Sequence, residues 1–261
     1  ETEGNPQCRF GITSRFTPGD AVRIDAITDD GQYHAWTEIN VPQRPFEIEN
    51  VDTVTVPLAQ SGYTTEYLRY RITINDRPNE TNYYRIVIDK QTTLWGYNHE
   101  EGGDDYIYWT KHSYNFIGRE DVVLTDGQPT TGDDEDNGLF DTAKNIYGVF
   151  DDTRFRNTSY TMTVYNNTKI ETGSDSGYFS GMDVIIRLMS ITETEYYYLK
   201  ALNLVDSDAY DETINEPIKY PSNVHGGTGM VGISTEVTQT IHIISSSHSK
   251  GNLAPPVHVY Q

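Results

Sequence analysis

The sequence predicts an all-β protein, a mainly antiparallel sandwich or open barrel with one or two short helices. Tyrosine is abundant, with 20 residues in 261, and Thr, Val and Ile dominate the segments with regular patterns. These residue types favour strands over helices. Several short segments also alternate apolar and polar side chains and are separated by polar loops, which is typical of packed antiparallel sheets.

The clearest strand covers residues 67–75. Its apolar residues recur at every second position and therefore share one face, namely Leu68, Tyr70, Ile72 and Ile74. The polar turn NDRPNETN follows, and the alternation resumes over residues 83–89. We therefore expect these two segments to pair as an antiparallel hairpin. Similar alternation predicts strands at 21–27, 160–165, 182–188 and 237–244.

One helix is expected near residues 192–205. Thr192 and Glu195 have the spacing of a capping box, in which a threonine hydroxyl and a glutamate satisfy backbone N–H groups at the start of a helix. The sequence YYYLKALNLV continues in helical register. Its apolar face would consist of Tyr198, Leu199, Leu202 and Val205.

Two structural units are expected along the chain. Residues 1–45 form a small N-terminal β unit, because two strand-like segments are followed by the proline-bounded exit VPQRP. Residues 46–261 form a larger β-rich domain that contains the helix. The hinge between the two units is expected at Pro42–Pro45.

The charge of the chain limits its partners. The formal net charge is −20, from 39 acidic and 19 basic residues. A field of this sign repels the phosphate backbone, so nucleic acid is not an expected partner. The sequence has no run of about 18 apolar residues that could span a bilayer. The one cysteine, Cys8, cannot form a disulfide within the chain.

The segment LWGYNHEEGGDDYIYW combines aromatic and acidic residues and is the candidate ligand-binding site. Aromatic faces stack on the apolar faces of sugars or side chains, and carboxylates accept hydrogen bonds from hydroxyl groups. Two core strands that flank a polar turn would produce the same pattern. The candidate ligand-binding residues are Trp95, Tyr97, Tyr106, Tyr108, Trp109, Asp104 and Asp105. No catalytic residue is assigned.

An acidic run between residues 121 and 141 holds the candidate metal site. Its ligands would be Asp133, Asp134, Glu135 and Asp136, because Ca²⁺ prefers several carboxylate oxygens on a flexible loop. Lys144 occupies the position at which an EF-hand requires a glutamate, so the EF-hand pattern is only half met. A solvated acidic loop is the alternative. Calcium is the one cofactor considered, and no other is expected.

Four sequence blocks, taken in order, resemble a known family. They are INDRPNETNYYRIVI, YGVFDDTRFRNTSYTMTVY, ITETEYYYLKAL and EPIKYPSNVHGGTGMVGI. Together they are similar to the domain of unknown function family 4249 of Bacteroidetes surface lipoproteins. Within these blocks we expect Asp76, Asp152 and Asn223 to hold turns by accepting backbone N–H bonds. Gly226 and Gly227, beside Asn223, permit a positive φ.

The resemblance implies a non-enzymatic lipoprotein on the cell surface, with an Ig-like or prealbumin-like unit at its N-terminus. It implies a lipid anchor in the outer membrane, on a cysteine outside this chain, as the only membrane contact. The implied role is accessory to a TonB-dependent transporter in capturing a nutrient, either glycan or peptide. Two alternatives remain: a structural or adhesive surface protein without a small ligand, and a surface glycan hydrolase that uses Asp104, Asp105 or nearby carboxylates.

Overall fold

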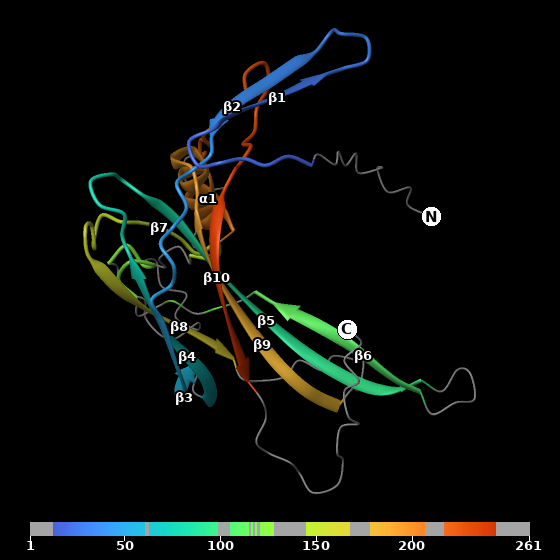
Figure 1. The fold of residues 1–261 in the computed structure, drawn as a ribbon, viewed down its shortest axis with the longest axis vertical. Helices are drawn as coiled ribbons and strands as arrows, with labels where there is room; N and C mark the ends of the chain where they lie inside the picture. Colours follow the sequence, from blue (N-terminus) through green and yellow to red (C-terminus); the bar gives the residue numbers. More distant parts are fainter. Residues whose placement is uncertain are drawn as a thin grey trace, which may run out of the picture.

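The computed structural model describes residues 13–60, 63–98, 105–114, 116, 118, 121–127, 145–167, 178–206 and 217–243. Within these residues lie ten strands and one helix (Figure 1). The elements are β1 (Ala21–Ile27), β2 (His34–Asn40), β3 (Asn50–Gln60), β4 (Tyr63–Asn75), β5 (Tyr83–Asn98), β6 (Asp105–Ser113), β7 (Val149–Asp151), β8 (Ser159–Asn167), β9 (Tyr178–Ser190), α1 (Glu193–Val205) and β10 (Thr235–Ile243).

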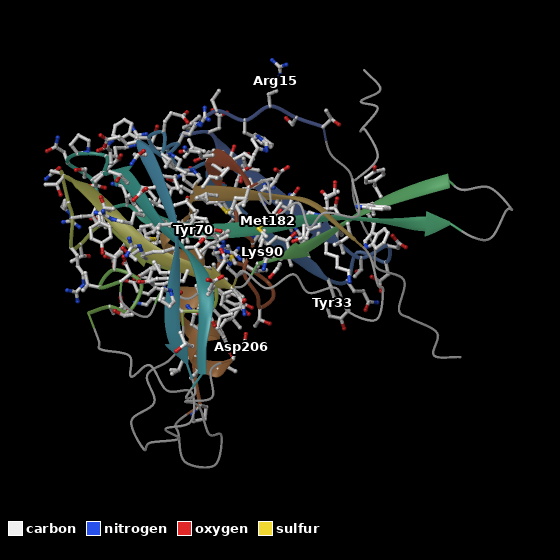
Figure 2. All side chains as sticks on the ribbon, turned by 90° about the horizontal axis from the view of Figure 1, so that it is seen from below. Arg15, Tyr33, Tyr70, Lys90, Met182 and Asp206 are labelled. Atoms are coloured by element: carbon white, nitrogen blue, oxygen red, sulfur yellow. The ribbon has the colours of Figure 1, made fainter. Side chains whose placement is uncertain are left out.

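Two antiparallel sheets pack face to face and enclose the main core. One sheet has the strand order β10-β9-β5-β6, with β7 also paired to β5, and the other has the order β3-β4-β8. The core between them draws on alternate residues of β4, β5, β8 and β9, such as Ile72, Ile88, Val164 and Ile186, all of which are fully buried. Tyr70 and Met182 belong to the same cluster and lie near the centre of Figure 2. The predicted all-β antiparallel fold is confirmed.

The alternation predicted for residues 67–75 is confirmed. Tyr70 and Ile72 are fully buried, whereas Arg71 between them is exposed. The same alternation places the two tyrosines that begin β5 on opposite faces of the sheet. Tyr84 belongs to the main core, while Tyr83 packs on the other side of its sheet, against the helix. β4 and the start of β5 therefore follow the period of two that their sequences show.

The predicted hairpin between residues 67–75 and 83–89 is wrong. β4 pairs with β3 and β8, whereas β5 pairs with β6, β7 and β9, so the loop between them crosses from one sheet to the other. Both strands bury a complete apolar face in the same core. Placing them in opposite sheets lets those faces meet across the core, whereas a hairpin would have set them side by side.

The helix begins where its sequence predicts, but only the threonine half of the capping box forms, since Oε2 of Glu195 is buried with no hydrogen-bond partner among the described residues. The Oγ1 atom of the N-cap Thr192 accepts a hydrogen bond from the backbone N–H of Glu195 at 3.2 Å. α1 lies on the outer face of the five-stranded sheet, where Leu199 belongs to a small cluster that also contains Val149 and Ile191. Figure 1 shows the helix at the end of this sheet that carries β7.

The buried face of the helix differs in part from the predicted one: Leu199 is buried as predicted, and Tyr198 and Leu202 pack against its cluster. The most buried residues of the helix are Glu195, Tyr196, Leu199 and Asn203, whereas the predicted Tyr198, Leu202 and Val205 are only partly buried. Asn203 can occupy a buried position because its side-chain oxygen and nitrogen both form hydrogen bonds. Its Oδ1 accepts from the backbone N–H of Tyr147 at 3.0 Å, and its Nδ2 donates to Oδ1 of Asn145 at 2.9 Å. Hydropathy alone does not anticipate such a polar contact.

β1 and β2 form a separate two-stranded sheet that projects from the sandwich in Figure 1. Trp36 of β2 exchanges two backbone hydrogen bonds with His225, at 3.0 and 2.8 Å, and their rings stack 4.1 Å apart. The proline-containing segment after β2 is attached to β10, since Oγ1 of Thr235 donates to the carbonyl oxygen of Gln43 at 3.2 Å. The division into units 1–45 and 46–261 stays a prediction.

The three residues expected to hold turns do accept backbone N–H bonds, but those of Asp76 and Asp152 join distant loops instead of closing a single turn. Asp76 Oδ2 accepts the backbone N–H of Asn157 at 2.8 Å, and Asn223 Oδ1 accepts that of Val231 at 2.9 Å. Asp152 makes the corresponding bond to a residue in the loop between β4 and β5. Gly226 has a φ of 76°, which a glycine adopts without strain.

Candidate ligand-binding face

The predicted ligand-binding residues lie on two neighbouring strands. The antiparallel ladder between β5 and β6 pairs Trp95 with Tyr108 and Tyr97 with Tyr106. Asp104 lies outside the described residues, as do the side chains of Tyr97, Asp105 and Tyr106. Of the predicted residues, Trp95, Tyr108 and Trp109 have side chains that the structure describes.

These three aromatic residues do not form one platform. Trp95 and Tyr108 are directly opposite in the ladder and so share a face, whereas Trp109 projects to the other face. The ring of Trp109 covers Gly96, where an added Cβ would lie 3.2 Å from the ring. Trp95 is only 3% exposed and offers little ring surface to a ligand, while Tyr108 is 42% exposed.

Tyr108 begins a stripe of side chains along β6. Every second residue of β6 projects to the same face, which gives the series Tyr108, Thr110 and His112, and Tyr114 follows one residue after the strand ends and contacts His112. Tyr114 is 57% exposed, and its ring stacks on that of His112 with 6.1 Å between centroids. Among the described strands, β6 lies at the edge of its sheet. We call these four residues the β6 stripe.

A buried carboxylate lies beside the stripe on β5. Asp89 is 2% exposed, and its Oδ1 and Oδ2 atoms lie 3.0 and 3.2 Å from Nδ1 of His112. Gln91 Nε2 donates a second hydrogen bond to Oδ2 at 2.7 Å. A buried carboxylate requires such partners. When the Asp89 carboxylate accepts this hydrogen bond, the proton of His112 lies on Nδ1, and Nε2 faces away from Asp89 as a second hydrogen-bonding group.

The polar residues continue across the sheet in one row. The register places His112 opposite Gln91, Gln91 opposite Asp183, and Asp183 opposite His242, so the row crosses β6, β5, β9 and β10. The Nδ1 atom of His242 lies 2.6 Å from Oδ1 of Asp183. Each of the outer strands β6 and β10 therefore supplies a histidine that pairs with an aspartate on the strand next to it.

Small residues separate this polar row from Trp95 and Tyr108. The register places Thr93 opposite both Thr110 and Gly181. A Cβ added at Gly181 would meet no atom within 4 Å, so the surface above it is open. The face therefore has a row of small residues at its middle. On one side of this row lie the histidine and aspartate side chains of the polar row, and on the other side lie Trp95 and Tyr108.

The helix covers only one end of this sheet face. Tyr83, at the start of β5, contacts the ring of Tyr196 at 4.9 Å and donates a hydrogen bond to Oε1 of Glu193 at 2.8 Å. Among the described elements, α1 is the one that packs on this side of the sheet, and its partners lie near β7. Figure 1 shows the far halves of β5 and β6 extending away from the helix.

The candidate calcium ligands, Asp133, Asp134, Glu135 and Asp136, lie outside the described residues. Within the part of the chain that the structure describes, no three His, Cys, Asp or Glu residues lie close enough together to hold a metal ion. Nor does any described helix combine the length and apolar character that a bilayer crossing requires.

The arrangement is suited to binding a molecule rich in hydroxyl groups. The exposed tyrosines offer flat apolar surfaces, and Gln91 and His112 offer hydrogen-bonding groups that Asp89 holds in place. Sequence reasoning identified Tyr108 but missed Asp89, Gln91, His112, Asp183 and His242. Asp89 and His112 are 23 residues apart, and Asp183 and His242 are 59 apart, so only the strand register brings each pair together.

These observations define an antiparallel β-sandwich protein with one packed helix and a polar and aromatic sheet face. Residues 2–240 match the family model described as "Domain of unknown function (DUF4249)". The chain therefore belongs to this family, as its four sequence blocks indicate. A comparison with the curated proteins finds no match.

Proposed function

We propose that this protein is a non-enzymatic surface lipoprotein that captures a nutrient, glycan or peptide, beside a TonB-dependent outer-membrane transporter. The observation that supports binding lies on the outer face of β5 and β6. There, the exposed rings of Tyr108 and Tyr114 flank His112, which is fixed by the buried Asp89. Exposed aromatic rings beside fixed hydrogen-bonding groups are the common elements of a ligand surface.

The outer-membrane location, the lipid anchor and the transporter are further parts of this proposal. They rest on the resemblance to surface lipoproteins, which is an argument by association. The strongly acidic composition, with a net charge of −20, is compatible with a soluble surface domain. The anchor would be a cysteine outside this chain.

The test is purification of the tagged, full-length, lipidated protein from native outer membranes, followed by mass spectrometry. A transporter recovered in near-equal amount supports the accessory role. The same purification with Tyr108→Ala separates transporter contact from ligand contact. We expect the variant to retain the transporter, because the β6 stripe is assigned to the ligand. Recovery of the wild-type protein without any transporter would contradict the accessory role.

A structural or adhesive role is the second candidate, and the β1–β2 sheet favours it. Ile24 is 46% exposed, Ile27 63% and Tyr33 73%, and Tyr33 lies at the periphery of the molecule in Figure 2. Ile24 and Ile27 lie on opposite faces of β1, so both faces of this projecting sheet expose apolar side chains that could contact another protein. If Ile24→Ser with Ile27→Ser abolishes surface assembly and Tyr108→Ala leaves nutrient uptake intact, the adhesive role replaces the capture role.

A further inference from the structure

We infer that the ligand of this face is an uncharged oligosaccharide that lies lengthwise along β6. The inference rests on the proposed binding function and specifies its ligand. The occupied surface would be the β6 stripe together with Gln91 on the neighbouring strand.

The stripe has the shape of a site for an extended ligand. Tyr108 lies four residues before His112 on one face of β6, which corresponds to about 13 Å at 3.3–3.4 Å per residue, and Tyr114 follows one residue after the strand ends, so Tyr108 and Tyr114 lie at the two ends of the stripe. Both rings are exposed, and the ring of His112 stacks on that of Tyr114 between them. A chain of sugar rings presents repeated apolar C–H faces, so it can stack on successive flat side chains at this spacing.

The hydrogen-bonding groups are fixed before a ligand binds. Asp89 is buried and its carboxylate is occupied by His112 and Gln91, so it is a positioning residue and not a ligand contact. Its hydrogen bonds leave Nε2 of His112 and Oε1 of Gln91 as groups of defined orientation. Fixed groups reduce the entropy lost on binding, and neutral hydroxyls can satisfy both of them.

The charge of the face favours a neutral ligand. Asp183 of β9 pairs with His242 of β10 on this face, and Nη1 of Arg187, also on β9, lies 3.4 Å from a carboxylate oxygen of Glu236. The chain as a whole carries a net charge of −20, which repels acidic sugars. A peptide that added as a strand would bind the backbone of the β6 edge, so its affinity would depend little on the tyrosine rings.

The test is titration of the full chain with defined hexasaccharides, namely cellohexaose, maltohexaose, xylohexaose and mannohexaose, against hexagalacturonate and an extended hexapeptide. We expect at least one neutral hexasaccharide to bind and hexagalacturonate to bind at least tenfold more weakly. Tyr108→Ala and Tyr114→Ala should each weaken binding about tenfold, the effect of 1.4 kcal/mol. Tyr33→Ala, an exposed tyrosine on the β1–β2 sheet, is the matched control and should bind as the wild type.

The role of Asp89 is tested with Asp89→Asn. Nitrogen-15 NMR of the His112 ring should report the Nδ1–H form in the wild type and a mixture of tautomers in the variant, with weaker binding. A purely structural role for Asp89 would change the melting temperature but leave the tautomer of the folded protein unchanged. An unaltered His112 signal in folded Asp89→Asn would overturn the positioning role.

Three outcomes overturn the inference. The first is that no neutral hexasaccharide binds with a Kd below about 1 mM. The second is preferred binding of hexagalacturonate or of the peptide, and the third is release of shorter sugars during the titration, which would indicate a hydrolase. If a transporter is recovered but no sugar binds, the accessory role is supported and only the proposed ligand class is wrong. If a sugar binds but no transporter is recovered, the ligand class is supported and the accessory role is wrong.

Discussion

The Oδ2 atom of Asp152 accepts a hydrogen bond from the backbone N–H of Asn82 at 2.9 Å, and Asp152 is completely buried. Asn82 ends the loop that crosses between the two sheets, and Asp152 follows β7. The bond therefore fixes the point at which the chain enters β5. The other carboxylate oxygen of Asp152 accepts from Nη2 of Arg156 at 3.0 Å, so both oxygens have partners.

Asp152→Ala should lower the free energy of unfolding by about 2 kcal/mol, because it removes the acceptor of the backbone N–H of the half-buried Asn82. The ion pair with Arg156 adds little to this loss, since Arg156 is 44% exposed. Urea denaturation measures the change. Asp29→Ala, at an exposed aspartate, is the control and should change stability by less than about 0.5 kcal/mol. Equal effects of the two substitutions would contradict the assigned role.

Glu195→Gln should stabilise the protein at neutral pH and not at pH 4. Burial raises the pKa of Glu195 above its usual 4.5, while Arg85 opposes the shift. The folded protein thus holds this proton more tightly than the unfolded chain. The resulting stability is complete below the unfolded pKa and is lost as the pH rises through the folded pKa. As the pH is raised from 4 to 8, the melting temperature of the wild type should fall relative to that of the variant.

Glu193→Gln is the control for Glu195→Gln, because it makes the same charge change at an exposed position in the same helical turn. It removes a favourable charge at the helix N-terminus and should lower the melting temperature slightly at neutral pH. Parallel pH profiles for the two variants would show that burial of Glu195 has no effect on stability.

Gly226→Ala should detach the β1–β2 sheet from the C-terminal segment. Gly226 has a φ of 76°, and a Cβ there would lie 2.3 Å from the carbonyl oxygen of His34. Gly31 has a φ of 67° with no atom within 4 Å of the added Cβ, so Gly31→Ala carries the backbone strain without the clash. The strain costs about 1–2 kcal/mol. Hydrogen exchange at Trp36 N–H should accelerate in the first variant only.

Tyr70→Phe should leave stability unchanged or raise it slightly. The Tyr70 hydroxyl is buried and has no hydrogen-bond partner among the described residues. Tyr160 donates to Oδ1 of Asp121 at 3.0 Å, so Tyr160→Phe should cost about 1.5 kcal/mol. Chemical denaturation of both variants measures the difference. A larger loss for Tyr70→Phe than for Tyr160→Phe would show that the Tyr70 hydroxyl makes a bond in solution.

Part of the candidate face is visible in the sequence. Tyr108 lies in an aromatic and acidic segment, and this composition is what identified it. The same reasoning grouped it with Trp95 and Trp109, because composition does not report which face of a strand a residue occupies or how deeply it is buried. Asp89 and His112 gave no signal, since an aspartate and a histidine 23 residues apart form a pair only when their strands lie in register.

The sequence by itself determined the family, the all-β class, the strands with clear alternation and the start of α1. These features depend on neighbours a few residues apart, such as Ile72 two residues from Tyr70, or Thr192 three residues from Glu195. Only the tertiary structure decided that β4 and β5 lie in opposite sheets and that His112 meets Asp89. Those outcomes depend on which apolar faces bury each other across the core, a choice between distant segments that local patterns do not encode.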